Sequence, residues 1–291
     1  MTDASSLDFA RRVKRYNPAM RCRIVLFLIV TSAVFPSCNK AKPTSGGAEQ
    51  LVFRNAQGRE LKAKDLAGVT GIVNWSMVGA DNVPQHAREL HDLGQQEGSA
   101  GYYDKALLLF AQAQQEAPQW PYPAYDAAYT SLLNGNLDQA ERDYAVVERL
   151  SPRGFFTAKA EMDCIGREHA KDFASGTCKS YVLVAAMPDS PEKRAGLERL
   201  LRQSPSLAPA WKELAVLLPD DNARMAAIIK GLSCQPDGDT RGILLINQAL
   251  ILNRQGKHSE AVSILGELAL DPQSTLMTEQ LAKATLANLP K

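Results

Sequence analysis

The chain has 291 residues, of which 45% are hydrophobic and 22% are charged, and its formal net charge at pH 7 is +1. These values are ordinary for a globular protein. Residues 1–37 hold a net charge of +4, so the remainder carries −3. A mildly acidic body argues against binding to nucleic acid, which requires a basic surface.

The first element along the chain is an apolar run from Ile24 to Phe35. Arg21 and Arg23 precede this run, and Ser37 follows it. The run is too short to cross a bilayer as a helix, which needs about 20 residues. A basic stretch, a short apolar core and a small residue at the cut are typical of a secretory signal. We therefore expect an exported protein, with an uncleaved hydrophobic anchor as the alternative.

The residues that end this run, Phe35-Pro36-Ser37-Cys38, resemble a bacterial lipobox, although the usual leucine and the usual small residue of that motif are replaced. In a lipobox the cysteine is lipidated and becomes the new N-terminus. The resemblance implies a signal peptide over residues 1–37 and a lipid on the cysteine. It also implies a location in the cell envelope, anchored by lipid, with the outer membrane or the periplasmic face favoured.

Two segments flank this signal. Residues 1–19 are long for the basic part of a signal peptide, so Met20 is an alternative start of the protein. Residues 38–50 begin with the lipidated Cys38 and are polar, with one proline and two glycines. This composition predicts a flexible tether between the lipid and the body of the protein.

Residues 51–85 differ from all that follows, because they favour strands. Leu51-Val52-Phe53 is apolar, and Gly71 to Trp75 is a β-prone run. The stretch faintly resembles the opening of a thioredoxin-like domain, in which redox cysteines would follow the tryptophan. Here Ser76 and Met77 follow instead, and the segment is too short for a whole domain of that kind. We expect a small β-hairpin packed on the first helices.

Two stretches then repeat each other at a spacing of 34 residues. The matching pairs are Gly101 and Gly135, Ala106 and Ala140, Phe110 and Tyr144, Ala113 and Val147, and Pro118 and Pro152. This pattern of small residues, an A-x3-F pair and a closing proline resembles the tetratricopeptide repeat (TPR). The resemblance implies antiparallel helix pairs over 87–120 and 121–154. One pair cannot cover its own apolar face, so neighbouring pairs must stack.

The remainder of the chain continues this pattern in a weaker form. Ser190 followed by Pro191 predicts a helix over 191–203, and Trp211 restarts the repeat pattern. Helix-ending prolines punctuate the chain at 118, 152, 188, 205, 236 and 272. We therefore expect an all-α fold over residues 86–291, a TPR-like α-solenoid of antiparallel helix pairs, preceded by a short β-containing segment.

One group of side chains stands out as a candidate binding site. The TPR resemblance places the first helix of each repeat on the concave face of the solenoid, where it would present aromatic rings flanked by charges. Such clusters commonly form the energetic core of a protein or peptide site. The alternative is that the β segment or an internal helix packs over these rings. The candidate partner-binding residues are Trp120, Tyr122, Tyr125, Tyr129, Phe156, Lys159 and Arg167.

The cysteines add a second expectation. If residues 155–186 fold as a helical hairpin, Cys164 and Cys178 can face each other and form a disulfide in an oxidising compartment. The alternative is that both are small buried apolar residues, as free cysteines often are. No C-x-x-C motif occurs, so thiol redox chemistry and zinc ribbons have no support.

Catalytic and metal-binding motifs are missing from the sequence. His86 and His91 are five residues apart, which is off the i, i+4 spacing that places two ligands on one helix face. No H-E-x-x-H, G-x-S-x-G or Walker motif occurs. We predict no enzyme activity, no cofactor and no metal site. The predicted function is a membrane-anchored scaffold that binds a protein or peptide. The alternative is a redox or other enzyme with a truncated thioredoxin-like N-terminal part.

Overall fold

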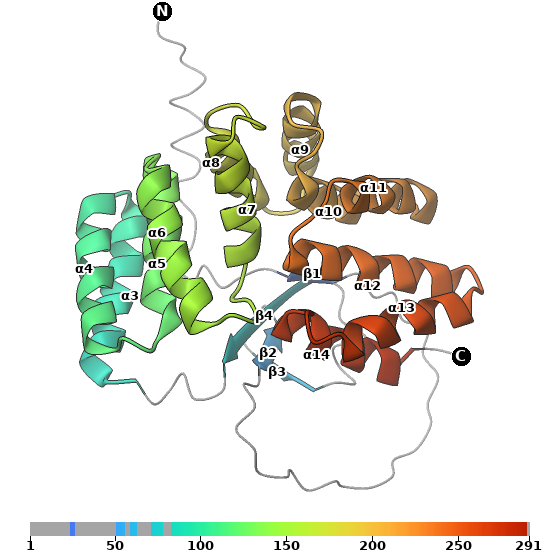
Figure 1. The fold of residues 1–291 in the computed structure, drawn as a ribbon, viewed down its shortest axis with the longest axis horizontal. Coiled ribbons are helices and arrows are strands. Elements are labelled where there is room, and N and C mark those ends of the chain that lie inside the picture. The colour runs from blue at the N-terminus through green and yellow to red at the C-terminus, as the bar shows by residue number, and fades with distance from the viewer. Residues whose placement is uncertain (1–23, 27–50, 56–58, 63–70, 78–82, 290–291) are drawn as a thin grey trace, which may run out of the picture.

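The computed structural model describes residues 24–26, 51–55, 59–62, 71–77 and 83–289. Within these ranges it contains twelve α-helices that follow one another along the chain, and a small sheet beside them (Figure 1). The predicted all-α fold is confirmed, since residues 83–289 form helices and their connections alone. The helices are α3 (Gln85–Ala100), α4 (Tyr103–Glu116), α5 (Pro121–Asn134), α6 (Leu137–Leu150), α7 (Ala158–His169), α8 (Thr177–Ala185), α9 (Pro191–Gln203), α10 (Ala208–Leu217), α11 (Asp221–Ser233), α12 (Gly238–Arg254), α13 (His258–Leu270) and α14 (Leu276–Ala287).

The helices pack in consecutive pairs, in the manner expected for TPR-like repeats. The two well-matched copies correspond to α3 with α4 and to α5 with α6. Gly101 and Gly135 end the first helix of each pair with φ values of 86° and 85°. Glycine adopts this left-handed conformation without the steric cost that a side chain would add.

Close approach inside the first pair depends on one small residue. A Cβ atom on Gly94 would lie 2.5 Å from Cε1 of Phe110, so only glycine lets the phenylalanine ring pack flat against α3. Phe110 and its counterpart Tyr144 are both fully buried. The repeated pattern of small and aromatic residues therefore sets the distance between the paired helices.

The later helices follow the same plan with one interruption. α9 spans the predicted 191–203, and the Ser190 hydroxyl accepts a hydrogen bond of 3.2 Å from the Lys193 N–H, as an N-cap residue does. This helix stands between the pair α7 and α8 and the pair α10 and α11. α12 and α13 form the last pair, and α14 packs on both of them.

The N-terminal strands form one antiparallel sheet in the order β1-β4-β2-β3, a larger unit than the predicted hairpin. The strands are β1 (Ile24–Leu26), β2 (Leu51–Asn55), β3 (Glu60–Leu61) and β4 (Gly71–Met77). β1 lies inside the segment predicted to be a signal peptide. Cleavage of that signal would remove β1 and leave the three other strands paired.

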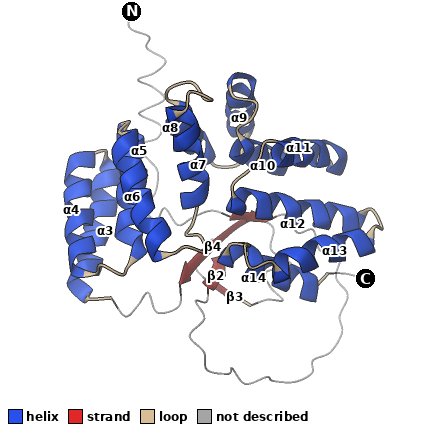
Figure 2. Cartoon of the chain, viewed as in Figure 1, coloured by secondary structure: helices blue, strands red, loops and turns tan. Residues whose placement is uncertain are grey.

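The sheet is attached to the C-terminal end of the helical region. The backbone N–H of Leu51 in β2 donates a hydrogen bond of 3.4 Å to Oε1 of Gln280 in α14, and Phe53 and Leu61 are buried in the main core. Figure 2 shows the strands beside α14. The expected packing of the β segment on the first helices is therefore replaced by packing on the last one.

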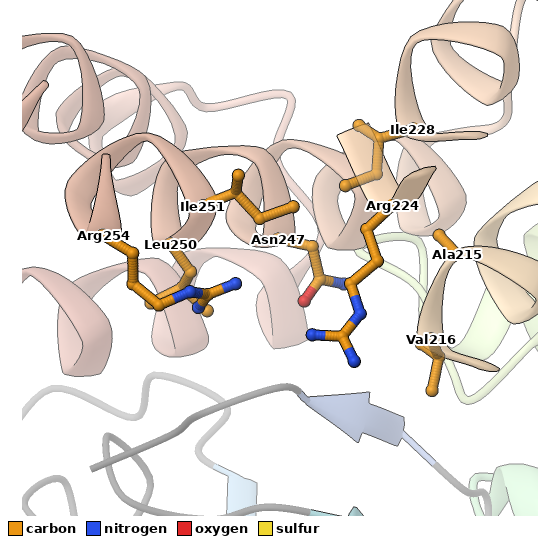
Figure 3. Close-up of a pocket in the computed structure, with 8 residues that line it drawn as sticks. All are labelled: Ala215, Val216, Arg224, Ile228, Asn247, Leu250, Ile251 and Arg254. Atoms are coloured by element: carbon orange, nitrogen blue, oxygen red, sulfur yellow. The ribbon is translucent and has the colours of Figure 1, made fainter. Parts of the chain in front are cut away.

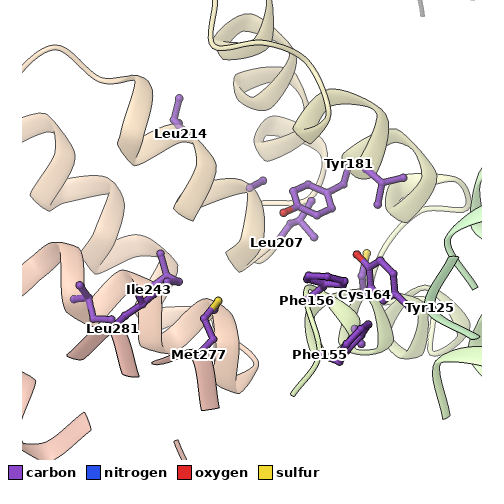
Figure 4. Packing of buried hydrophobic residues seen from close by; sticks show 14 of the residues in the cluster. Tyr125, Phe155, Phe156, Cys164, Tyr181, Leu207, Leu214, Ile243, Met277 and Leu281 are labelled. Atoms are coloured by element: carbon purple, nitrogen blue, oxygen red, sulfur yellow. The ribbon is translucent and has the colours of Figure 1, made fainter. Parts of the chain in front are cut away.

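The helical chain also curls back on itself. α7 contacts α12, and the backbone N–H of Leu276 at the start of α14 donates a hydrogen bond of 2.8 Å to the carbonyl of Arg153, between α6 and α7. One continuous core results, and Figure 4 shows buried side chains from Tyr125 to Leu281 within it. The final helix is buried on most of its surface, and the face that carries Lys283 and Ala287 stays in solvent.

Candidate functional site

The inner surface of α3 and α5 carries a small hydrogen-bonded network. Asp126 of α5 accepts two hydrogen bonds from α3, one of 2.7 Å involving Nε2 of His91 and one of 2.8 Å from Nε2 of Gln95. His91 is 5% exposed, while Gln95 and Asp126 are half-buried. The network fixes the carboxylate of Asp126 between α3 and α5.

Two of the predicted aromatic residues lie beside this network. The Trp120 ring centroid is 4.8 Å from that of His91 and 5.6 Å from that of Tyr122. Both aromatic side chains are half-buried, as is Tyr129 further along α5. The indole N–H of Trp120 is buried and has no hydrogen-bond acceptor among the described residues. These three rings, with Gln95 and Asp126, form what we call the inner aromatic face.

Two other predicted binding residues belong to the core. Tyr125 and Phe156 are 8% and 7% exposed, and their ring centroids are 5.1 Å apart. The Tyr125 hydroxyl is 2.8 Å from Oγ1 of Thr157, so its polar end has a partner inside the protein. For these two residues, the alternative of internal packing holds. They pack there because the loop before α7 places Phe155 and Phe156 against the tyrosines of α5.

The predicted basic residues of α7 are also engaged within the chain. Lys159 Nζ lies 2.6 Å from Oε2 of Glu148, and Arg167 Nε lies 3.0 Å from Oδ2 of Asp163. The guanidinium of Arg167 also donates hydrogen bonds to the carbonyls of residues 234 and 235, at the end of α11. Arg167 therefore joins α7 to the end of α11, whereas the Lys159 ion pair joins α7 to its neighbour α6.

A cluster of buried acids lies where α7 meets α12. Glu161 of α7 is 3% exposed and Asp239 of α12 is 6% exposed. Burial raises the pKa of Glu161 to about 8 and the pKa of Asp239 to about 7, and the nearby Asp237 carboxylate adds to both increases. Burial disfavours the charged form of a carboxyl group. Sequence reasoning missed this cluster, because its members are 78 residues apart along the chain and meet only through the curl.

A neighbouring buried acid behaves in the opposite way. Burial alone would raise the pKa of Glu213, but Lys212 and Lys193 lower it below its usual value. The Lys193 ammonium is 3.0 Å from Oε2 of Glu213, and that of Lys212 is 3.2 Å from Oε1. Direct ion pairs keep Glu213 charged, whereas Glu161 and Asp239 have no ion pair this close among the described residues.

A pocket opens between α10, α11 and α12 (Figure 3). Apolar side chains form most of its wall, and Arg224, Asn247 and Arg254 supply its polar groups. Both guanidinium groups already bond within the protein, Arg254 to the carboxylate of Asp221 and Arg224 to the carbonyl of Leu218. Oδ1 of Asn247 is buried and has no partner among the described residues. The pocket thus offers a ligand one unused acceptor and two guanidinium groups that already bond within the protein.

The structure joins Cys164 to Cys178 by a disulfide that links α7 to α8, with Cα atoms 5.8 Å apart. The two residues are 1% and 0% exposed, so the bond is inaccessible to a protein thiol in the folded state. Reactive cysteines need partial exposure. Cys234 is the free cysteine of residues 83–289, and its Sγ lies 3.1 Å from the Lys230 carbonyl oxygen.

Two further kinds of site are absent from the part of the chain that the structure describes. No three His, Cys, Asp or Glu side chains there come together in a way that could hold a metal ion. No helix in the same ranges has the length and apolar character of a membrane-spanning segment. The predicted signal peptide and lipidated cysteine fall almost entirely outside the described residues.

Comparison with known proteins adds little to this picture. No family model matches the chain, and neither does any curated protein. Among solved structures, a thermophilic TPR protein from Thermus thermophilus is similar, with 20% sequence identity over 69% of this chain and 99% of that chain. The TM-score of that match is 0.30, so the TPR-like description rests on the helix pairs themselves.

Proposed function

We propose that this protein is a scaffold that binds another protein or a peptide through the inner aromatic face of α3 and α5. The observation that carries the proposal is the arrangement of half-buried Trp120, Tyr122 and Tyr129 beside the carboxylate of Asp126. Aromatic rings supply large contact area at low entropic cost, and a neighbouring fixed charge gives the contact its orientation. No catalytic step is proposed.

Site-specific crosslinking in cells tests this face. A photoreactive phenylalanine analogue in place of Tyr129 should give a discrete crosslinked product, because a bound partner would cover that position. The matched control carries the same analogue in place of Ala145, which is exposed on the outer surface of α6. Equal crosslinking at the two positions, or none at Tyr129, would contradict the proposal.

The membrane attachment is a separate part of the proposal. The lipobox-like sequence before Cys38 supports a lipid on that residue, which would hold the helical body at the surface of the cell envelope. We expect the native chain to sediment with membranes until detergent is added, with residues 1–37 removed and a lipid on Cys38, whereas the Cys38→Ala variant carries no lipid and retains residues 1–37. Mass spectrometry of the N-terminal peptide would identify the lipid.

The control for this experiment is Cys22→Ala, which removes a cysteine inside the predicted signal and should leave fractionation unchanged. If the N-terminal peptide of the native chain still contains residues before Cys38 and carries no lipid, the N-terminal segment is an uncleaved anchor, and the proposed lipid attachment is wrong.

A further inference from the structure

The curled shape of the helical chain depends on a contact that we call the seam. On one side are residues 151–157 and α7, and on the other are residues 237–242 and the first turn of α14. Three bonds cross it: the hydrogen bond of 2.8 Å from the Leu276 N–H to the Arg153 carbonyl, the ion pair between Arg153 and Glu279, and a hydrogen bond of 3.4 Å from the Arg153 guanidinium to the Ser274 carbonyl. These residues are more than a hundred positions apart along the chain, so the seam joins its two halves.

Packing at the seam is close. A Cβ atom on Gly154 would lie 3.2 Å from the side chain of Thr275 and 3.3 Å from Oδ1 of Asp239, and one on Gly238 would contact the side chains of Thr275 and Lys159. Glu161 and Asp239 are buried inside this contact, whereas Gly238 and the Arg153 side chain at its edge are exposed to solvent.

Both sides contribute a buried carboxyl group. Glu161 comes from α7 and Asp239 from the first turn of α12, and one oxygen of each, Oε2 and Oδ2, has no hydrogen-bond partner among the described residues. Burying a carboxyl oxygen without a hydrogen-bond donor costs more free energy when the group is ionised than when it is neutral. The closed seam is therefore suited to the neutral forms.

Other ionisable groups face these two acids from the surrounding elements. The Asp237 carboxylate repels the charged form of both, and Glu213 of α10 repels that of Glu161. Lys212 of α10 attracts both charges, and Lys159 of α7 attracts that of Asp239.

Two neutral side chains and one phenol complete the surroundings. Thr157 and Thr275 form hydrogen bonds with Glu161 and Asp239, respectively. The Tyr144 phenol of α6 is close enough for the Glu161 charge to act on it, and its hydroxyl has no hydrogen-bond partner among the described residues. Burial outweighs the attraction of the lysines at both carboxyl groups, which raises the pKa of Glu161 to about 8 and that of Asp239 to about 7.

We propose that the seam is a pH-sensitive latch, closed while Glu161 and Asp239 are protonated and opened when both ionise. Each of the two negative charges would be repelled by Asp237 and would require water, and separating α7 from α12 and α14 admits it. This inference concerns the fold and does not depend on the proposed partner binding.

The direction in which pH shifts the latch follows from the direction of the pKa changes. Both carboxyl groups bind their protons more tightly in the closed form, because burial raises the pKa of Glu161 to about 8 and that of Asp239 to about 7. The closed form therefore holds more protons than the open form, so raising the pH favours opening. The contribution of the two protonated carboxyl groups to the stability of the closed form is full below their ordinary pKa values of 4.5 and 3.8. It is lost as the pH rises through 7 to 8.

Hydrogen exchange at the Leu276 amide tests the latch, because that amide bonds across the seam. After correction for intrinsic exchange rates, its protection should fall by about tenfold or more between about pH 6 and about pH 9. The double variant Glu161→Gln, Asp239→Asn cannot ionise and should keep its protection. If the double variant does not fold, the single variant Glu161→Gln replaces it. Its protection at Leu276 should fall less than that of the native chain over the same pH range.

The matched control is Glu267→Gln, which removes an exposed carboxylate on α13 and should behave like the native chain. If protection at Leu276 in the native chain does not change over this pH range, the latch does not exist. If it falls equally in the native chain and in the variants without these carboxyl groups, other groups open the seam, and the assignment to Glu161 and Asp239 is wrong.

Discussion

Replacing Gly242 with alanine is expected to destabilise the protein strongly, because this residue lies where α12 crosses α14. A Cβ atom at that position would be 2.8 Å from Cβ of Thr278 and closer still to its Oγ1 and Cγ2. These distances are far inside van der Waals contact, and no rotation of the threonine side chain moves its Cβ away. We expect a loss of about 3 kcal/mol in the free energy of unfolding, at the upper end of the usual cost of overpacking.

Chemical denaturation followed by circular dichroism measures this loss. Gly266→Ala is the matched control, since Gly266 also lies inside a helix, but a Cβ atom added there would have no neighbouring atom within 4 Å. There the same substitution should stabilise the protein by up to about 1 kcal/mol, because alanine is the better helix former. Similar effects at the two glycines would show that α14 does not pack on α12 as described.

A second substitution tests whether the steric clash with Thr278 causes the loss of stability in Gly242→Ala. Thr278→Ala removes the two nearest atoms and leaves the Cβ contact, so the pair Gly242→Ala, Thr278→Ala should recover part of the lost stability. The double-mutant cycle should therefore give a favourable coupling free energy between the two positions. Additive effects would mean that these side chains do not meet.

Local repeat geometry was predictable from the sequence, because it is determined by residues that are close along the chain. The spacing of Gly101, Ala106 and Phe110 reports a contact between two adjacent helices, and the same pattern one repeat later reports the next pair. Ser190 and Pro191 likewise mark a helix start through backbone chemistry alone, and α9 begins there. Such features need no knowledge of the overall curvature.

The candidate site was less predictable, because it depends on how far the stacked pairs curl. A small change in the rotation between successive pairs accumulates along the chain and decides whether the concave face stays open. Here Arg167 bonds to the carbonyls at the end of α11, and Tyr125 and Phe156 join the core. Trp120, Tyr122 and Tyr129, ahead of the curl, keep the half-buried character expected of a binding face.

The contact between α7 and α8, the helix pair with the weakest repeat pattern, depends on features outside that pattern. α7 and α8 lack the A-x3-F pattern, and their contact is supported instead by Glu168, whose carboxylate accepts hydrogen bonds from the N–H groups of Gly176 and Cys178 at the start of α8. A carboxylate at a helix N-terminus is favourable because of the helix dipole. The Cys164–Cys178 bond then replaces the aromatic packing that joins the first two pairs.

Removing this bond is the second change from which we expect a large effect. It closes a loop with a sequence separation of 14 residues, for which the loss of unfolded-state entropy corresponds to about 3 kcal/mol. The variant Cys164→Ala, Cys178→Ala should therefore be less stable than the oxidised native chain by about that amount, as measured by urea denaturation. Hydrogen exchange should increase most in α7 and α8.

A reductant separates the contribution of the covalent bond to stability from the contribution of the packing of the two cysteine side chains. When unfolding is measured in excess reductant, both chains lack the bond, and the difference between them should shrink to the small contribution of the two sulfur atoms. Cys234→Ala removes the free cysteine and should have little effect under either condition. If the difference persists unchanged in reductant, the cavity left by the sulfurs destabilises the variant. If there is no difference at all, the third helix pair holds together without the bond, and the weak repeat pattern in residues 155–186 is sufficient for folding.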